Sequence, residues 1–120
     1  MKEGFSQRLF KTFPSGKIDL WIQAVSVGEA FLAIEIVRNL PAHPSVTLLI
    51  TSNTKQGVEI LKKELRQSIT HEVEVAYFPF DKPSIMRKVL LAIRPHLVVL
   101  LESELWPGLL DSCKKMGIRT

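Results

Sequence analysis

Residues 20–29 read LWIQAVSVGE, and this stretch decides the fold that the sequence predicts. Its first six residues form an almost unbroken apolar run, which is typical of a strand covered on both faces. Serine, glycine and glutamate follow at once, and a serine with a glutamate three residues later is a frequent helix start. A strand that leads directly into a helix is half of a βαβ unit, so the stretch indicates an α/β protein.

The rest of the chain continues the same alternation of apolar runs and segments with helical periodicity. The predicted strands are 20–25, 46–51, 73–78 and 97–101, and the predicted helices are 29–40, 54–66, 83–93 and 107–116. The third run is half polar, which predicts an edge strand. Gly117 suits the end of the last helix, and residues 118–120 resemble the entrance to a fifth strand.

These elements predict a Rossmann-like fold, with a parallel sheet and helices on both of its faces. The right-handed crossover rule and the common doubly wound order give the strand order 3-2-1-4. The first and fourth strands then lie side by side, and ligands of such sheets bind where the winding reverses, beyond the carboxyl ends of the strands. The predicted site therefore lies between the loops after Val25 and Leu101. The chain stops in mid-unit, so we expect a domain that is incomplete at its C-terminus.

Composition and charge favour one ordinary globular domain without a nucleic-acid partner. The chain has 120 residues, of which 46% are hydrophobic and 23% charged, and its net charge of +4 is spread along the sequence. The basic residues of the arm 1–18 alternate with phenylalanines, which suits an anionic membrane surface, although composition alone favours a solvated arm. No apolar run approaches the roughly 20 residues that cross a bilayer. We therefore expect a cytoplasmic chain.

Cofactor chemistry is not indicated by any motif in the sequence. The single cysteine, Cys113, excludes an internal disulfide and a thiolate metal cluster, and the three histidines lack metal-ligand spacing. The motifs G-x-G-x-x-G, G-x-x-x-x-G-K-[ST] and G-x-S-x-G do not occur, which weakens dinucleotide, P-loop and hydrolase interpretations. We predict no metal and no other cofactor.

The turn of residues 26–29 places a carboxylate at the predicted ligand edge. Ser26 and Glu29 have the spacing of a capping box, and capping explains Glu29 without any active site. A functional interpretation is also open, because Gly28 leaves room for a ligand and a helix N-terminus favours an ionised carboxylate. Such a carboxylate beside a hydroxyl can act as a general base.

A second acidic turn, ESELWP at residues 102–107, follows the fourth strand. Glu102 ends a buried strand, so its charge needs hydrogen-bond donors or solvent in a cleft. The alternative is structural, because Pro107 suits a helix start and acidic residues such as Glu104 suit the N-terminal side of that helix. The two explanations are balanced.

Weaker candidates follow the second and third strands at the same edge. Ser52 and Thr54 offer hydroxyl groups to a ligand, although capping of the next helix is the favoured role. Asp81 precedes a helix-starting proline, Pro83, and is predicted to be the N-cap of that helix.

Taken together, these motifs resemble the ordered signature of the Kdo transferases, which add 3-deoxy-manno-octulosonic acid (Kdo) to lipid A. The resemblance rests on WIQAVSVGE (21–29), TSNT (51–54) with Gly57, PFD (79–81) and ESELWP (102–107). Residues 4–8 are also similar to the segment that follows a membrane-anchoring helix in that family.

The resemblance implies the N-terminal half of a GT-B glycosyltransferase. Residues 19–120 would be part of the acceptor-binding domain, with the C-terminal donor-binding domain missing and the chain alone inactive. The implied reaction is an inverting transfer of Kdo from CMP-Kdo to a lipid A precursor at the cytoplasmic face of the bacterial inner membrane, without a metal. Glu29 matches the general base of the family. The expected substrate-binding residues are Ser26, Gly28, Ser52, Thr54, Glu102 and Glu104.

Two residues depart from the family pattern, and three alternatives stay open. Gly108 stands where the family usually has asparagine, and Gln23 replaces a more usual histidine without an assigned role. The chain could instead serve another GT-B transferase with a different nucleotide sugar. It could also be a non-catalytic α/β module that binds a ligand or a membrane, or a truncated product without function.

Overall fold

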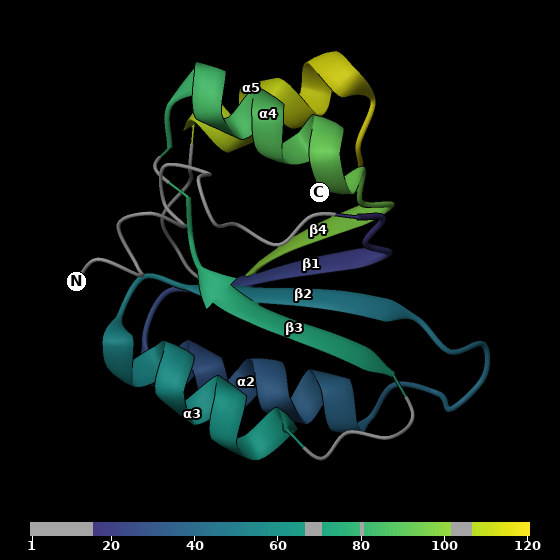
Figure 1. Ribbon diagram of the computed structural model, residues 1–120, viewed down its shortest axis with the longest axis vertical. Helices are drawn as coiled ribbons and strands as arrows, with labels where there is room; N and C mark the ends of the chain where they lie inside the picture. The colour runs from purple at the N-terminus through teal and green to yellow at the C-terminus, as the bar shows by residue number, and fades with distance from the viewer. Residues whose placement is uncertain (1–15, 67–70, 80, 102–106) are drawn as a thin grey trace.

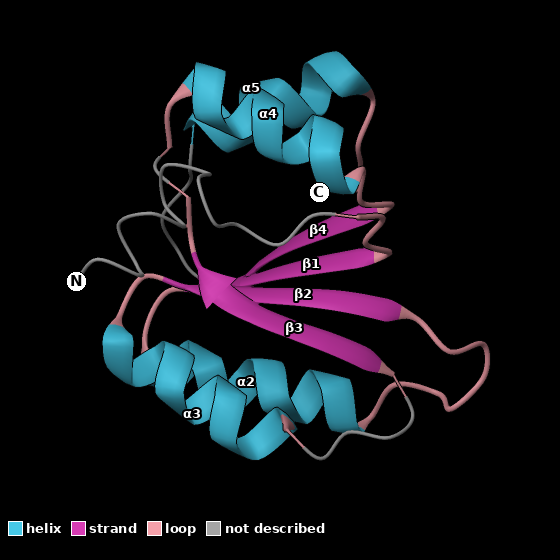
Figure 2. Cartoon of the chain, viewed as in Figure 1, coloured by secondary structure: helices cyan, strands magenta, loops and turns pink. Residues whose placement is uncertain are grey.

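The computed structural model describes residues 16–66, 71–79, 81–101 and 107–120, which form one parallel sheet between two layers of helices (Figure 1). In chain order the elements are β1 (Leu20–Ala24), α2 (Val27–Arg38), β2 (Thr47–Ser52), α3 (Lys55–Leu65), β3 (Glu72–Tyr77), α4 (Pro83–Ile93), β4 (Leu97–Leu101) and α5 (Pro107–Met116). Helices α2 and α3 cover one face of the sheet, and α4 and α5 cover the other (Figure 2). The predicted α/β class is confirmed.

The order of the sheet is β3-β2-β1-β4, as predicted, and all three neighbouring pairs are parallel. Strand β1 pairs with β4 from Leu20 opposite Leu97 to Ala24 opposite Leu101. The predicted entrance to a fifth strand is confirmed at Arg119, whose carbonyl oxygen accepts a hydrogen bond of 2.8 Å from the amide of Val98. The carboxyl ends of β1 and β4 therefore lie side by side.

Helix α2 departs from its predicted bounds by two residues at each end. It begins at Val27 because Ser26 is the extended N-cap residue, which makes Glu29 the third residue of the helix. It ends at Arg38 because the side chain of Asn39 donates to the carbonyl oxygen of Glu35 at 2.7 Å. Strands β2 and β3 are each displaced from prediction by one residue, whereas α4, β4 and α5 have the predicted bounds.

Two hydrophobic cores lie on opposite faces of the sheet, and adjacent residues of β1 belong to different ones. Trp21 joins the core under α4 and α5, Ile22 joins the core over α2 and α3, and neither side chain is exposed. The first core also contains Leu49, Phe78, Met86, Leu90 and Ile93, and the second contains Ile34, Leu48, Ile50 and Leu61. Burial on both faces explains why these strands lack polar alternation.

The described helices are short, and of the N-terminal arm the structure describes the end that joins the core. In the described ranges the longest helix, α2, has 12 residues, and no helix there is long and apolar enough to span a bilayer. Of the predicted arm 1–18, only residues 16–18 are described, and Ile18 is buried in the core under α4 and α5.

Cys113 offers a chemical probe of this packing. Its side chain is 1% exposed, and burial raises the pKa of the thiol to about 11. Because the thiolate is the reactive form, we expect a disulfide reagent at neutral pH to label the native chain far more slowly than the urea-unfolded chain. Equal labelling rates in the two states would show that the face of α5 that carries Cys113 is not packed in the core.

Candidate functional site

The candidate site lies at the carboxyl edge of the sheet, where α2 begins immediately after β1 (Figure 1). Ala24 and Leu101 pair there, so the loops that follow β1 and β4 start from neighbouring positions. Glu102 and Glu104 fall in the segment 102–106, which lies outside the described residues. The predicted approach of Glu102 to Glu29 therefore stays a prediction.

Glu29 closes the N-terminus of α2 as the acidic member of a capping box. Its Oε1 accepts hydrogen bonds from the amide of Ser26 at 3.2 Å and from the hydroxyl of Ser26 at 2.6 Å. The bond from this hydroxyl is the main reason that the pKa of Glu29 lies below its usual value of 4.5, and desolvation offsets only part of that effect. The carboxylate is therefore ionised at neutral pH.

The surface of α2 beside Glu29 is open and apolar. A Cβ atom added to Gly28 would meet nothing within 4 Å. Val27, Phe31 and Leu32 are 36%, 51% and 56% exposed. This patch was not predicted from the sequence, because the apolar side chains of a helix in an α/β fold are expected to face the sheet. The predicted site residue Gly28 thus lies at the edge of an apolar surface, which we call the α2 patch (Val27, Phe31 and Leu32).

The hydroxyl groups of Ser52 and Thr54 already have partners within the chain. Ser52 is fully buried and donates to the carbonyl oxygen of Val25 at 3.0 Å, which ties the end of β2 to the end of β1. Thr54 is the N-cap of α3 and accepts from the amide of Gly57 at 3.0 Å, as the capping interpretation predicts. A Cβ atom on Gly57 would lie 2.3 Å from Ser52 Oγ. Close packing against Ser52 therefore explains why a glycine occupies this position.

A buried chain of hydrogen bonds runs from the core to the loop after β2. The indole Nε1 of Trp21 donates to Thr51 Oγ1 at 2.8 Å, and this hydroxyl donates to Gln23 Oε1 at 2.6 Å. The amide nitrogen of Gln23 then donates to Asn53 Oδ1. Gln23 and Thr51 face each other in the β1–β2 register, and both are fully buried. Gln23, which sequence reasoning left without a role, therefore fixes the loop that holds Asn53.

Replacing Gln23 by leucine removes this link at nearly constant volume. The Thr51 hydroxyl loses its acceptor and Asn53 loses its donor, so we expect the free energy of unfolding to fall by roughly 1–3 kcal/mol. Urea denaturation measures the change. The control is Gln56→Leu, at an exposed position of α3. An equal effect of the two substitutions would contradict the structural role of Gln23.

The prediction that Asp81 caps α4 is wrong. Lys82 is the N-cap residue of that helix, and the Asp81 carboxylate instead accepts from two amides at the start of α5, Gly108 at 3.0 Å and Leu109 at 2.8 Å. The first amides of a helix lack partners within it and favour negative charge, which explains the contact. A Cβ atom on Gly108 would lie 2.8 Å from Asp81 Oδ1. The glycine at this position thus allows the loop after β3 to contact α5.

The described part of the chain holds no group of three or more His, Cys, Asp or Glu side chains that could bind a metal ion. Of the predicted site residues that are described, the structure joins Ser26 with Glu29 and places Gly28 beside them, and it ties Ser52 to the carbonyl group that precedes Ser26. What the site offers chemically is one ionised carboxylate at a helix N-terminus, next to an apolar surface.

The chain is similar to known proteins over most of its length. A family model described as 3-Deoxy-D-manno-octulosonic-acid transferase (kdotransferase) matches residues 3–120. A 3-deoxy-D-manno-octulosonic acid transferase of Rickettsia bellii is 36% identical over 97 residues, which cover 80% of this chain and 22% of that protein. A probable mitochondrial 3-deoxy-D-manno-octulosonic acid transferase of Arabidopsis thaliana is 32% identical over 98 residues, or 81% of this chain and 21% of that protein.

A third relative carries a different description. The bifunctional glycosyltransferase/methyltransferase of Fusobacterium nucleatum is 31% identical over 121 residues, which cover 99% of this chain and 19% of that protein. The chain therefore spans about a fifth of the length of the curated relatives it matches.

Proposed function

The chain belongs to the 3-deoxy-D-manno-octulosonic-acid transferase family of glycosyltransferases, and from that premise we propose that it forms the acceptor side of a Kdo transferase with Glu29 as general base. In the proposed reaction, an acceptor hydroxyl of a lipid A precursor attacks the anomeric carbon of Kdo in CMP-Kdo. Glu29 takes the hydroxyl proton, the bond to CMP breaks with its electron pair, and the configuration inverts. No metal or other cofactor takes part.

The state of the Glu29 carboxylate is the observation that carries this proposal. Both hydrogen bonds from Ser26 end on Oε1, so they leave Oε2 available to a bound hydroxyl. The lowered pKa keeps the group deprotonated at neutral pH, which a base requires before it acts. The carboxylate also stands at the sheet edge where open α/β folds bind ligands.

The α2 patch supports a lipid acceptor. Its three apolar side chains begin one residue from Ser26 and extend along the first turns of the helix. Large apolar side chains in contact with water at a binding edge suit a ligand that carries acyl chains. The basic and aromatic composition of residues 1–18 suits contact with the cytoplasmic face of the bacterial inner membrane, which completes the proposal.

A second candidate is another glycosyltransferase of the same architecture that uses a different nucleotide sugar. The relative from Fusobacterium nucleatum favours it, because its description names a glycosyltransferase without specifying Kdo and it matches nearly the whole chain. In that case the residues that determine donor specificity would lie outside this chain and would differ from those of a Kdo transferase. Glu29 would still act as the general base.

A transfer assay on the complete protein that contains this chain tests the proposal. We expect CMP-Kdo and a lipid A precursor to give CMP and a Kdo-bearing lipid, identified by mass spectrometry, without added divalent metal and in the presence of a chelator. Transfer from another nucleotide sugar but not from CMP-Kdo would favour the second candidate. Lipid binding without transfer from any donor would favour a non-catalytic module.

A further inference from the structure

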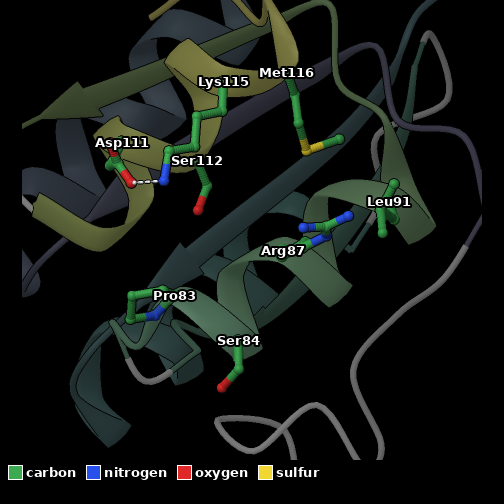
Figure 3. Close-up of a pocket in the computed structure, with 8 residues that line it drawn as sticks. All are labelled: Pro83, Ser84, Arg87, Leu91, Asp111, Ser112, Lys115 and Met116. Atoms are coloured by element: carbon green, nitrogen blue, oxygen red, sulfur yellow. Dashed lines mark ion pairs between the residues drawn. The ribbon is translucent and has the colours of Figure 1, made fainter.

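A pocket of about 420 Å³ lies between α4 and α5, and all of its lining residues belong to these two helices (Figure 3). Small-molecule sites typically measure roughly 300–1,000 Å³, so the pocket is large enough for a small organic ligand. It is separate from the candidate site, because neither Glu29 nor any residue of α2 lines it.

Two cations face the pocket from opposite walls. Arg87 projects from α4 toward α5 (Figure 3), and within the described residues its guanidinium makes no ion pair. Lys115 of α5 lies 3.0 Å from Asp111 in an i,i+4 pair whose side chains are 75% and 53% exposed. A pair as exposed as this is weak, so Asp111 holds Lys115 only loosely. The net charge of the residues that line the pocket is therefore positive.

A hydroxyl group faces the same space. Ser112 is 7% exposed and lines the pocket, and its hydroxyl makes no hydrogen bond to any described residue. A hydroxyl group that opens into the pocket can donate a hydrogen bond to a molecule bound there. The Ser112 hydroxyl lies on the pocket side of α5, where Lys115 also projects (Figure 3).

Apolar side chains complete the lining. Leu91 of α4 is 46% exposed, and Met116 of α5 is partly buried at the same part of the groove. A free oxyanion would leave both side chains in contact with water. An anion joined to an apolar body would cover them as well as pair with the cations.

We propose that this groove is a second binding site, which takes a small organic oxyanion: a phosphate or carboxylate group attached to an apolar body. The Arg87 guanidinium presents parallel N–H donors that match two oxygens of such a group. Lys115 adds charge, Ser112 donates its free hydroxyl, and Leu91 with Met116 packs against the body.

Phenyl phosphate and benzoate are suitable probes for an amide NMR titration of the chain. We expect at least one of them to give saturable shifts at amides of α4 and α5, with a dissociation constant on the order of 1 mM. Arg87→Gln should weaken binding about tenfold or more, because it removes a charge-assisted pair. Lys88→Gln is the matched control. It has the same charge change at the next exposed position of α4, outside the pocket lining, and should bind as the wild type does.

Further binding measurements test the contribution of each part of the site. Ser112→Ala should weaken binding severalfold with the melting temperature unchanged, and phenol or inorganic phosphate alone should bind more weakly than phenyl phosphate. The proposal fails if neither organic probe saturates, if Arg87→Gln and Lys88→Gln lose affinity equally, or if inorganic phosphate binds as tightly as phenyl phosphate. Because the readout is binding and not transfer, its outcome is independent of the function proposed for Glu29.

Discussion

The Glu29→Gln substitution is expected to lower kcat of the complete transferase by roughly 100- to 10,000-fold, the usual contribution of a general base. Glutamine has the shape of glutamate, and its carbonyl oxygen can still accept from the Ser26 amide, so the helix start is retained. The neutral amide cannot take a proton. Transfer of Kdo from CMP-Kdo to a lipid A precursor is measured together with the melting temperature. The pair of measurements separates the proposed catalytic role of Glu29 from its role as a helix cap.

Glu35→Gln is the matched control for that experiment. Glu35 lies on the same helix with an exposed side chain, and among the described residues no hydrogen bond or ion pair reaches its carboxylate. The Glu35→Gln substitution should leave both kcat and the melting temperature unchanged. If Glu29→Gln melted as the wild type does and still transferred Kdo at a comparable rate, Glu29 would be a helix cap only.

Trp21→Ala is expected to reduce the free energy of unfolding by roughly 3–5 kcal/mol, the range for large core side chains. Trp21 is fully buried, its ring centroid lies 6.0 Å from that of Phe78, and its indole donates to Thr51. Since a domain is commonly stable by about 5–15 kcal/mol, this loss is a large part of the total. Urea denaturation followed by far-UV circular dichroism measures it.

The variant Trp21→Phe separates packing from hydrogen bonding at the same position. It keeps an aromatic ring near Phe78 but removes the donor to Thr51 Oγ1, so its cost should be smaller than that of Trp21→Ala. A loss below about 1 kcal/mol for Trp21→Ala would mean that the ring is not at the centre of this core.

The sheet order could be predicted because it depends on a few strong and general constraints. Four apolar runs separated by helical segments allow few parallel topologies, and the crossover rule selects among them. The bounds of α4 and α5 could be predicted because Pro83 and Pro107 fix helix starts and Gly117 follows the second helix at positive φ.

The contacts that tie the loops together could not be predicted, because they join residues far apart in the sequence. Asp81 has the local pattern of an N-cap, but the free amides of Gly108 and Leu109 are 27 and 28 residues away. Gln23 interrupts an apolar strand, and the reason becomes visible only when β2 places Thr51 opposite it. Local chemistry identifies a polar group that needs a partner, whereas topology decides which partner it finds.

The role of Glu29 could be predicted from the sequence only in part. Its spacing from Ser26 predicted the cap, and the cap forms. That the bonds to Ser26 end on one carboxylate oxygen, beside an exposed apolar patch, is a property of the folded chain. Capping and catalysis are then compatible in one residue, since Oε1 closes the helix and Oε2 can accept a proton.

The pH dependence of this cap follows from the direction of the pKa shift. The folded chain holds the pKa of Glu29 below 4.5, so the ionised group stabilises the fold above that pH. The contribution is lost as the pH falls from 4.5 through the lower pKa of the folded state. Acid unfolding of Glu29→Gln should therefore depend less on pH in this window than that of the wild type.

An NMR titration of the Glu29 side-chain carboxyl carbon tests most directly whether one carboxylate both closes α2 and stays ionised. We predict a midpoint below 4.5, with the Ser26 amide shift following the same midpoint because that amide donates to Oε1. A midpoint at or above 4.5, or a Ser26 amide that does not respond, would contradict this account of Glu29.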